Sequence, residues 1–475
     1  MSNNIPAGLG FTLERAHLVG VGGAGMSAIA RILIDRGFVV SGSDAKGSHV
    51  LTGLTARGVK TAIGQRAENL DLLTGGPTAV VISTAINPSN PELAAARERG
   101  IPIVRRASAL AALMDGYRRV CVAGTHGKTS TTSMLTVALQ HAGVDPSFAI
   151  GGELNESGTG AHSGSGDIFI AEADESDGSF LAYSPHGAII TNLEPDHLDH
   201  HGSAEAYTAV FDQFAQRIAP GGFLIACVDD PGVAALVGRL GVGSPRVIGY
   251  GRSATADVLL RDSEQFGHGS RMTIETQGRS HTLTLDVPGE HMALNAVAAF
   301  AAGLALGIDA EPLIDGLARY TGVRRRFEFK GRAAGVVVYD DYAHHPTEVS
   351  AQIAAARTIV GQGRLVVIFQ PHLYSRTQTF AVAFGRALAG ADLVIQMDVY
   401  GAREEPQVGV SGQLIVDAIP AGTAIVVYEP SMAATATTAA ALLVPGDVVI
   451  TMGAGDVTMI GPELLELLTA GEESR

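Results

Sequence analysis

A lysine and two hydroxyl side chains follow a glycine turn about a quarter of the way along the chain. The run Gly124-Thr125-His126-Gly127-Lys128-Thr129-Ser130 comes directly after four apolar residues. Glycines let backbone N–H groups approach phosphate oxygens, the lysine adds positive charge, and the threonine hydroxyl can bind Mg²⁺. A plain turn with an exposed lysine is the alternative, and Val122 stands where the general motif has its first glycine. The apolar run before the turn and the Thr-Ser-Thr-Thr helix start after it favour a nucleoside triphosphate site.

Carboxylates and imidazoles follow two later strand-like runs. Residues 172–177 read Glu-Ala-Asp-Glu-Ser-Asp, and residues 192–201 contain three histidines. The carboxyl ends of parallel strands meet at one edge of a sheet, where such groups can coordinate the Mg²⁺ that bridges phosphates. We therefore expect Thr129, Glu172 and His197 to be metal ligands.

Neighbouring residues in these two runs have simpler explanations. Asp177 and His201 are each better explained as parts of solvated turns. His197, His200 and His201 together leave zinc open as an alternative metal. The neighbouring glycine–lysine turn favours magnesium.

His291 and Asn295 lie four residues apart at the start of an alanine-rich stretch, 291–305. On a helix they would share one face and could hydrogen-bond an adenine edge. Taken alone, the pair is better explained as a helix cap and a polar surface pair.

Three polar loops follow strand-like runs in the last third of the chain. They are residues 340–346, 370–377 and 453–456. Three such loops on one edge of a sheet predict a face that closes on the segment with the glycine–lysine turn.

A second glycine turn lies near the N-terminus. Gly20, Gly22 and Gly25, with Asp44 about twenty residues on, fit the dinucleotide fingerprint. Spacing alone favours NAD. The same turn suits any pyrophosphate at a helix N-terminus, so both interpretations stay open.

These groups must be positioned by alternating strands and helices, which predicts an α/β fold. The 475 residues favour three domains: a Rossmann-like domain at 1–115, a central P-loop domain at 116–322 and a Rossmann-like domain at 323–475. Short alternating stretches between 258 and 287 predict a small antiparallel addition to the central sheet.

Composition excludes several partner classes. A formal charge of −15 argues against nucleic acid or an anionic membrane as the main partner. Cys121 and Cys227 lie in apolar runs, which indicates buried thiols in a reducing compartment. The start of the chain shows no signal-peptide pattern, and the longest apolar run is too short to span a bilayer. We expect a cytoplasmic protein, a monomer or a homodimer.

With these motifs assembled, the chain resembles the Mur ligases along nearly its whole length, and most closely the branch that adds alanine. The motifs that carry the resemblance are Gly20–Ser27, Ser41–Asp44, Gly124–Thr129, Glu172–Asp177, Asp196–Asp199, Arg325–Phe327 and Asp340–Pro346. The resemblance implies that the N-terminal turn holds the pyrophosphate of a UDP-sugar instead of NAD. It also implies that ATP phosphorylates the lactyl carboxylate of UDP-N-acetylmuramate and that L-alanine attacks the acyl phosphate, with ATP and Mg²⁺ as cofactors.

The resemblance assigns roles to residues at matching positions. The ATP site would comprise Gly124, Thr125, His126, Gly127, Lys128, Thr129, Ser130, His291, Asn295 and Arg325, with Thr129, Glu172 and His197 on the metal. The UDP-sugar would face Gly22, Ala24, Gly25, Met26, Ser43, Ser83 and Arg106. The amino acid and acyl phosphate would face Tyr342, His344, His372 and Arg376. Catalytic roles would fall to Lys128, Arg325 and Arg376, with His344 as general base.

Two positions depart from the family pattern. Leu373 stands where related ligases often have arginine, so carboxylate recognition would fall to Arg376. No lysine lies beside Glu175-Ser176-Asp177, where some members carry a carbamylated lysine, and His197 would serve instead.

Four rival functions remain at the level of sequence. A recycling ligase that attaches a ready-made peptide to the same UDP-sugar shares most of these motifs. A folate-type polyglutamate ligase lacks the first glycine turn. An NAD-dependent oxidoreductase would leave the P-loop unused, and a nucleotide-gated regulator would release no phosphate in response to an amino acid.

Overall fold

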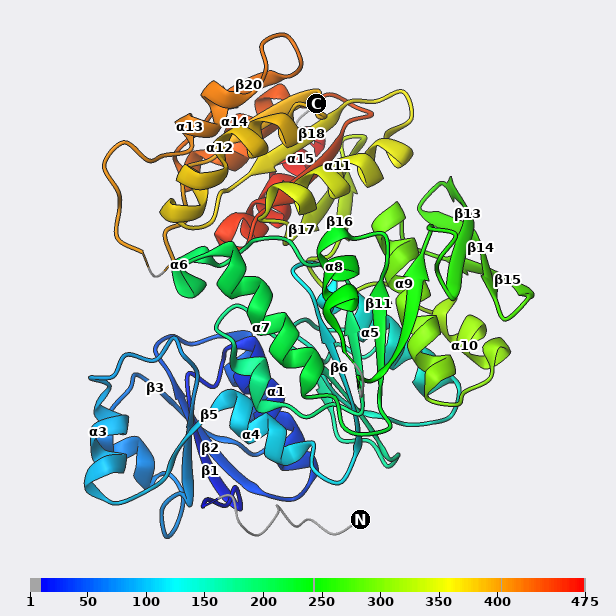
Figure 1. Ribbon diagram of the computed structural model, residues 1–475. Helices are drawn as coiled ribbons and strands as arrows, with labels where there is room; N and C mark the ends of the chain where they lie inside the picture. Colours follow the sequence, from blue (N-terminus) through cyan, green and yellow to red (C-terminus); the bar gives the residue numbers. More distant parts are fainter. Residues whose placement is uncertain (1–9, 242–243, 403, 474–475) are drawn as a thin grey trace. The chain divides into compact units, whose positions relative to one another are not determined.

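Three sheets, each built largely from parallel strands, make up the fold (Figure 1). The computed structural model describes residues 10–241, 244–402 and 404–473. These residues divide into two compact units. The first holds residues up to 261 with 274–281 and 295–319, and the second holds 262–273, 282–294 and the chain from 320 onward. The predicted α/β class is confirmed.

The first sheet is entirely parallel, with helices on both faces. Its order is β3 (Lys60–Ile63), β2 (Val39–Asp44), β1 (Arg15–Val19), β4 (Ala79–Ile82) and β5 (Ile103–Arg105). Leu18 and Val81 join one hydrophobic core with residues of α1 (Ala24–Asp35), α2 (His49–Ala56) and α4 (Arg106–Leu113). Their neighbours Val19 and Val80 join another core, with residues of α3 (Pro91–Glu98) and the short 3₁₀ helix η1 (Ala67–Asp71). Successive side chains of a strand point to opposite faces, so one strand supplies both cores.

The second sheet places β6 (Arg118–Ala123) where the strand order reverses. Next to it lie β10 (Gly187–Ile190) on one side and β9 (Ile168–Glu172) on the other, both parallel to it. The full order continues outward through β11 (Phe223–Cys227), β12 (Arg246–Gly251), β13 (Val258–Phe266), β14 (Gly269–Thr276) and β15 (Arg279–Leu285), and on the other side through β7 (Ser147–Ala149) and β8 (Ala161–His162). Ligand sites of open α/β sheets form at such a reversal, beyond the carboxyl ends of the strands.

The helices of this region follow the same alternation. They are α5 (Lys128–His141), η2 (Ser179–Ala182), α6 (Leu198–His201), α7 (Ala204–Gln216), α8 (Pro231–Arg239), α9 (Glu290–Ala305) and α10 (Ala310–Leu317). Strands β13, β14 and β15 are neighbours joined by two-residue links, which join only antiparallel strands. The predicted antiparallel addition is confirmed.

The third sheet has the order β16 (Glu328–Ala333), β17 (Val336–Asp341), β21 (Val448–Met452), β18 (Leu365–Phe369), β19 (Leu393–Gln396) and β20 (Ile425–Tyr428). Residues of α11 (Pro346–Val360), α12 (Tyr374–Leu388) and α13 (Gln413–Ala418) pack in a core on one face. Residues of α14 (Met432–Leu442), α15 (Ile460–Glu473) and η3 (Asp456–Met459) pack in a core on the other. The edge strand β16, antiparallel to β17, was not predicted from the sequence.

Two expectations from composition can be compared with the structure. Cys121 and Cys227 are buried and free, as predicted, and burial raises the pKa of the Cys121 thiol to about 12. In the described parts of the chain, no helix combines the length and the apolar character needed to cross a membrane.

Candidate active site

The turn between β6 and α5 has a backbone that suits only glycine at two positions. Gly124 has a φ of 135° and Gly127 a φ of 80°. A Cβ on Gly124 would lie 2.0 Å from Thr191 Oγ1, and a Cβ on Gly127 would lie 2.7 Å from Asn295 Oδ1. Gly127 is also the N-cap of α5. The turn therefore presents the unpaired N–H groups at the start of a helix, which suit an anion.

Lys128 Nζ lies inside this turn. It donates to the carbonyl oxygens of Gly124 (2.7 Å) and Thr125 (3.1 Å) and lies 2.8 Å from Glu175 Oε2. Burial alone lowers the pKa of the Lys128 ammonium, but nearby carboxylates, Glu175 first, together raise it above its ordinary value. The lysine is therefore a fixed positive charge beside the helix N-terminus.

The remaining residues of the turn are tied to the segment after β10. Thr125 Oγ1 donates to the carbonyl of Glu194 (3.0 Å), and His126 N donates to Asn192 Oδ1 (2.7 Å). The His126 ring lies 2.7 Å from Glu194 Oε1. Ser130 is buried in the first turn of α5. These contacts hold the turn against the neighbouring strand.

Two of the predicted metal ligands, Thr129 and Glu172, are in contact. Thr129 Oγ1 donates to Glu172 and lies 3.1 Å from both carboxylate oxygens. Gly151 N donates to Glu172 Oε2 (2.8 Å) and so orients the carboxylate. One hydroxyl and one carboxylate next to a phosphate site fit Mg²⁺, which binds few protein groups and takes other oxygens from phosphates and water.

His197, the third predicted ligand, precedes α6 at the carboxyl end of β10. Its φ is 51°, and its Nε2 lies 3.4 Å from Oδ2 of the buried Asp196. A carboxylate partner of this kind orients an imidazole ligand and raises its basicity. The strand ends that carry Thr129, Glu172 and His197 are thus adjacent in the sheet, as expected.

The two residues predicted at adenine are in different surroundings. Asn295 on α9 lies against Gly127, beside the phosphate turn. His291 is buried, and burial, followed by the charge of Arg326, lowers its pKa to about 4. His291 is therefore neutral at pH 7, with one ring nitrogen as donor and one as acceptor.

In the second unit, Arg325 is held at the carboxyl edge of the third sheet. Its φ is 59°, and its Nη2 donates to the carbonyls of Gly453 (2.7 Å) and Gly455 (3.1 Å). Its guanidinium lies 4.8 Å from the centre of the Tyr342 ring, and Nε lies 3.7 Å from the fully buried Asp340. Two of the three predicted loops on this edge therefore meet at Arg325.

The four residues predicted on the amino-acid side form one chain of contacts. The rings of Tyr342 and His344 are 5.3 Å apart, those of His344 and His372 are 5.9 Å apart, and Arg376 Nη1 lies 3.5 Å from His372 Nδ1. Tyr400, which was not predicted, stacks on His372. These residues come from the loops after β17, β18 and β19 and from the first turn of α12, all in one unit.

The local structure explains why these loops hold their positions. A capping box between His345 and Glu348, with Pro346 in the first turn, starts α11, and His344 directly precedes the N-cap residue His345. Leu373 is the N-cap of α12, with a φ of 72°, and its side chain is 2 % exposed. Leu373, at the position where related ligases often have arginine, is therefore in the core. The guanidinium that lies next to His372 belongs to Arg376.

The N-terminal glycine turn is held from inside its own domain. Gly22 N donates to Asp44 Oδ2 (2.9 Å), and a Cβ on Gly22 would lie 2.8 Å from that oxygen. Gly20 N donates to the carbonyl of Ser43 (2.8 Å), and the buried Ser43 hydroxyl donates to Glu92 Oε2 (2.8 Å). Ser43 and Asp44 thus support the turn.

Other residues predicted to bind the UDP-sugar surround the start of α1. Arg106 lies against Gly25, within 3.1 Å of where a Cβ would be, and its Nη2 lies 3.7 Å from Asp174 Oδ2. The Met26 side chain is buried in the core, so only its backbone amide could contact the UDP-sugar. Ser83 follows β4 and is half-buried. Arg106 thus connects the glycine turn with the acidic loop after β9.

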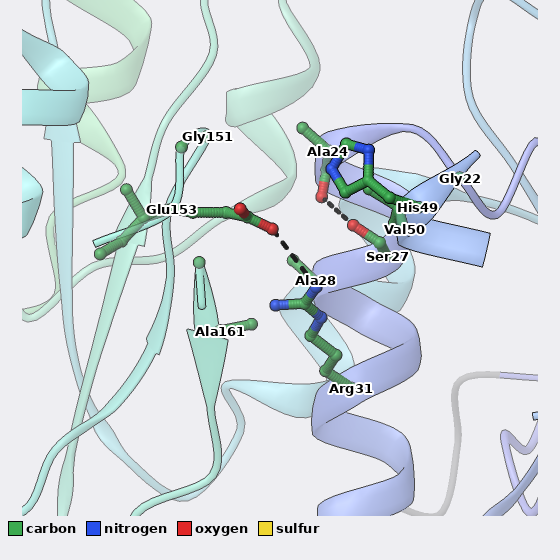
Figure 2. A pocket seen from close by; sticks show the side chains of 13 residues that line it. Gly22, Ala24, Ser27, Ala28, Arg31, His49, Val50, Gly151, Glu153 and Ala161 are labelled. Atoms are coloured by element: carbon green, nitrogen blue, oxygen red, sulfur yellow. Dashed lines mark hydrogen bonds and ion pairs between the residues drawn. The ribbon is translucent and has the colours of Figure 1, made fainter. Parts of the chain in front are cut away.

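Figure 2 shows a cavity between α1 and the loop that contains Gly151. Its volume is about 210 Å³, and its polar lining includes Ser27, Arg31, His49 and Glu153. Arg31 Nη2 lies 3.4 Å from Glu153 Oε1, and Arg31 Nη1 donates to Thr159 Oγ1 (2.7 Å). Of the residues in this lining, the sequence predicts Gly22 and Ala24 at the UDP-sugar. No sequence pattern indicates Arg31 or Glu153.

Three family models match consecutive parts of the chain. Residues 15–118 match "Mur ligase family, catalytic domain", residues 122–303 match "Mur ligase middle domain", and residues 325–455 match "Mur ligase, glutamate ligase domain".

Individual proteins resemble nearly the whole chain. A UDP-N-acetylmuramate–L-alanine ligase of Saccharopolyspora erythraea is 62% identical over 458 residues, which cover 95% of this chain and 93% of that protein. The crystal structure of the UDP-N-acetylmuramate-alanine ligase of Thermotoga maritima is 27% identical, with a TM-score of 0.79 over 97% of this chain and all of that one. A murein peptide ligase of Psychrobacter arcticus, 23% identical with a TM-score of 0.70 over 96% of this chain and 98% of that one, shares the fold. The chain belongs to the Mur ligase family.

Proposed function

We propose that the protein is an ATP- and Mg²⁺-dependent ligase that joins L-alanine to the lactyl carboxylate of UDP-N-acetylmuramate. The identity of 62% over 95% of the chain to a ligase of that name carries the choice of substrates. In this proposal residues 1–115 bind the UDP-sugar, 116–322 bind ATP, and 323–475 bind the amino acid. Both nucleotide substrates place the reaction in the cytoplasm.

The geometry of the first unit supports the ATP half. A helix N-terminus, a charged lysine and a hydroxyl–carboxylate pair lie at the ends of adjacent strands. Thr129, Glu172 and His197 would hold Mg²⁺, which would supply positive charge to neutralise the transferring phosphoryl group. Lys128 and the amides of α5 would stabilise the same charge as it develops. Asn295 would contact the base from this unit, whereas the neutral His291, the other residue assigned to adenine, belongs to the second unit.

The cavity beside α1 supports the UDP-sugar half. Its lining runs from Gly22 and Ala24, at the helix N-terminus that suits a pyrophosphate, to Gly151, whose amide binds Glu172. A sugar placed along it would have its phosphate side at α1 and its lactyl side toward the metal carboxylate. Complete ligand pockets span roughly 300–1,000 Å³, so a cavity of about 210 Å³ suits one part of the substrate.

The chemistry then takes two steps. The lactyl carboxylate attacks the γ-phosphorus while the bond to the ADP oxygen breaks, which gives an acyl phosphate. The L-alanine amine attacks the acyl carbon, and the tetrahedral intermediate expels phosphate to leave an amide. His344 would accept the amine proton, Arg376 would bind the alanine carboxylate, and Arg325 would stabilise phosphate charge. Holding both reactants in contact accounts for much of the acceleration.

Phosphate release is the direct test. ATP, Mg²⁺ and UDP-N-acetylmuramate are incubated with and without L-alanine, and the product mass is measured. The proposal expects release that requires both substrates and a product heavier by one alanine residue. Release with a muramyl-type peptide but not with L-alanine would indicate the recycling ligase instead. Binding of NAD in place of ATP and the UDP-sugar would indicate an oxidoreductase.

A further inference from the structure

Glu175 is a fully buried carboxylate to which no role in catalysis has been assigned above. Its Oε1 and Oε2 lie 3.0 and 2.8 Å from Lys128 Nζ, the ammonium placed at the phosphates. The Tyr207 hydroxyl donates to Oε1 at 3.4 Å and is 3.0 Å from Thr125 Oγ1 in the glycine turn. Glu175 is thus joined to that turn through both a cation and a hydroxyl.

Polar and charged groups reach Glu175 from each element packed against it. Lys128 approaches from α5, Tyr207 from α7, and the His201 ring from α6, where its Nε2 is 2.9 Å from the Glu175 carbonyl. Asp174 precedes it on its own loop and adds negative charge. Lys128 and the Tyr207 hydroxyl stabilise the ionised carboxylate, whereas burial and Asp174 oppose it. Sharing Lys128 with a second anion would therefore shift the balance toward the neutral carboxyl.

Nucleotide at the P-loop brings such a second anion. Lys128 must contact the phosphates. Its ammonium either moves away from Glu175 or is shared between Glu175 and the phosphates. In both cases a buried carboxylate loses part of its charge compensation, and a like charge arrives nearby, which favours the protonated carboxyl. We propose that Glu175 positions Lys128 and takes up one proton from solvent when nucleoside triphosphate binds, with a Glu175 oxygen as the protonated atom. This inference rests on the proposed ATP site.

The direction of the pH effect follows from linkage. Burial, opposed by Lys128, raises the pKa of Glu175 to about 7. Nucleotide raises it further, so at pH 8 binding converts an ionised carboxylate to a neutral one. The bound form then holds more protons than the free form, and affinity falls as pH rises above 7, toward about tenfold per pH unit. Below pH 6 the group is already protonated, and uptake disappears.

Calorimetry tests this without turnover. The non-hydrolysable analogue AMP-PNP with Mg²⁺ is titrated into the protein at pH 8 in buffers of different ionisation enthalpy, which yields the number of protons taken up. The wild type is expected to take up close to one proton per nucleotide. Glu175→Gln keeps the shape, removes the titrating group and should still bind nucleotide with uptake reduced to near zero and a flat pH profile.

Glu194→Gln is the matched control. Glu194 pairs with His126 in the same turn, but its side chain is 34 % exposed. This variant should retain the uptake. Equal proton uptake in the wild type and Glu175→Gln, or a wild-type nucleotide affinity independent of pH between 7 and 9, would overturn this inference and leave the proposed ATP site unaffected. No nucleotide binding by the wild type would overturn both the inference and the proposed ATP site.

Discussion

Single residues in the P-loop have partners that define their chemistry. Lys128 is oriented by two carbonyl groups of the turn and compensated by one carboxylate, and Thr129 is oriented by another. The orientation of each side chain is set before any step of the reaction, which is the condition for electrostatic catalysis. Replacing one such group should therefore affect turnover more than stability.

Lys128→Ala tests this for the ammonium. We expect turnover to fall by at least ~10²–10³-fold, since one charged donor to the transferring phosphoryl group is lost. Phosphate release and circular dichroism should be measured together. A folded variant with near-normal phosphate release would remove Lys128 from the mechanism.

His197→Ala tests the metal assignment. We expect the Mg²⁺ concentration for half-maximal activity to rise by about tenfold or more, because an imidazole ligand oriented by Asp196 is removed. His200→Ala, three residues later in α6 and with an exposed side chain, is the control. Identical magnesium titrations for wild type and His197→Ala would exclude His197 as a ligand.

Among the elements, α1 contributes to two sides of the proposed UDP-sugar site. In that proposal its first turn would offer amides to the pyrophosphate, and two turns later Arg31 contacts the loop at Glu153 and Thr159. Farther along, Arg36 donates to Ser163 (3.2 Å). Only the first two regions line the cavity among the described residues, whereas Arg36 lies outside it.

Arg31→Met is expected to raise the KM for UDP-N-acetylmuramate by roughly tenfold while leaving the KM for ATP unchanged. The substitution removes the charge-assisted contact between Arg31 and Glu153 in the lining of the cavity. Arg36→Met breaks a contact of the same helix outside the cavity and serves as control. If both variants raise the KM for UDP-N-acetylmuramate equally, the effect comes from the loss of contacts between the helix and the loop and not from a change in the cavity.

At the scale of the molecule, the residues assigned to the proposed reaction are divided between two compact units. Lys128, Glu172 and Asn295 belong to the first, and Arg325, His344 and Arg376 belong to the second. If both sets act on the same atoms, as proposed, we expect ligand binding to favour an arrangement in which the units close on the substrates.

Closure can be measured by small-angle scattering. We expect the radius of gyration to decrease when UDP-N-acetylmuramate and AMP-PNP with Mg²⁺ are added, because ligands in contact with both units favour the closed arrangement. UDP alone, which reaches fewer groups, is the control. Superimposable curves with and without the full ligand set would argue against closure.

Local patterns predicted most of the strands and placed polar residues at their carboxyl ends. The run from Gly124 to Ser130 is continuous in sequence, so its turn, cap and charge can be predicted together. Glu172 and His197 follow from the rule that parallel strands end at one edge. The edge strand β16 was missed because it is short of β-branched residues: charged residues alternate with Phe329, Gly331 and Ala333, and Gly331 has a φ of 153°.

Residues that act through distant partners could not be found this way. Arg31 meets Glu153 across 122 positions, and the Tyr400 ring stacks on His372 from another loop. Glu175 lies in an acidic run whose other carboxylates are half-buried, and Tyr207 of α7 packs against it. The sequence carries no local signal for such contacts.

The burial of both thiols has a practical consequence for measuring motion. Cys121 is at the centre of the second sheet with a pKa of about 12, and Cys227 is also in the core, so neither offers a reactive thiolate near neutral pH. A cysteine introduced on each unit's surface would therefore take up a fluorescent dye against a silent background. The native chain is in this respect ready for single-molecule energy-transfer measurements without first removing its own cysteines.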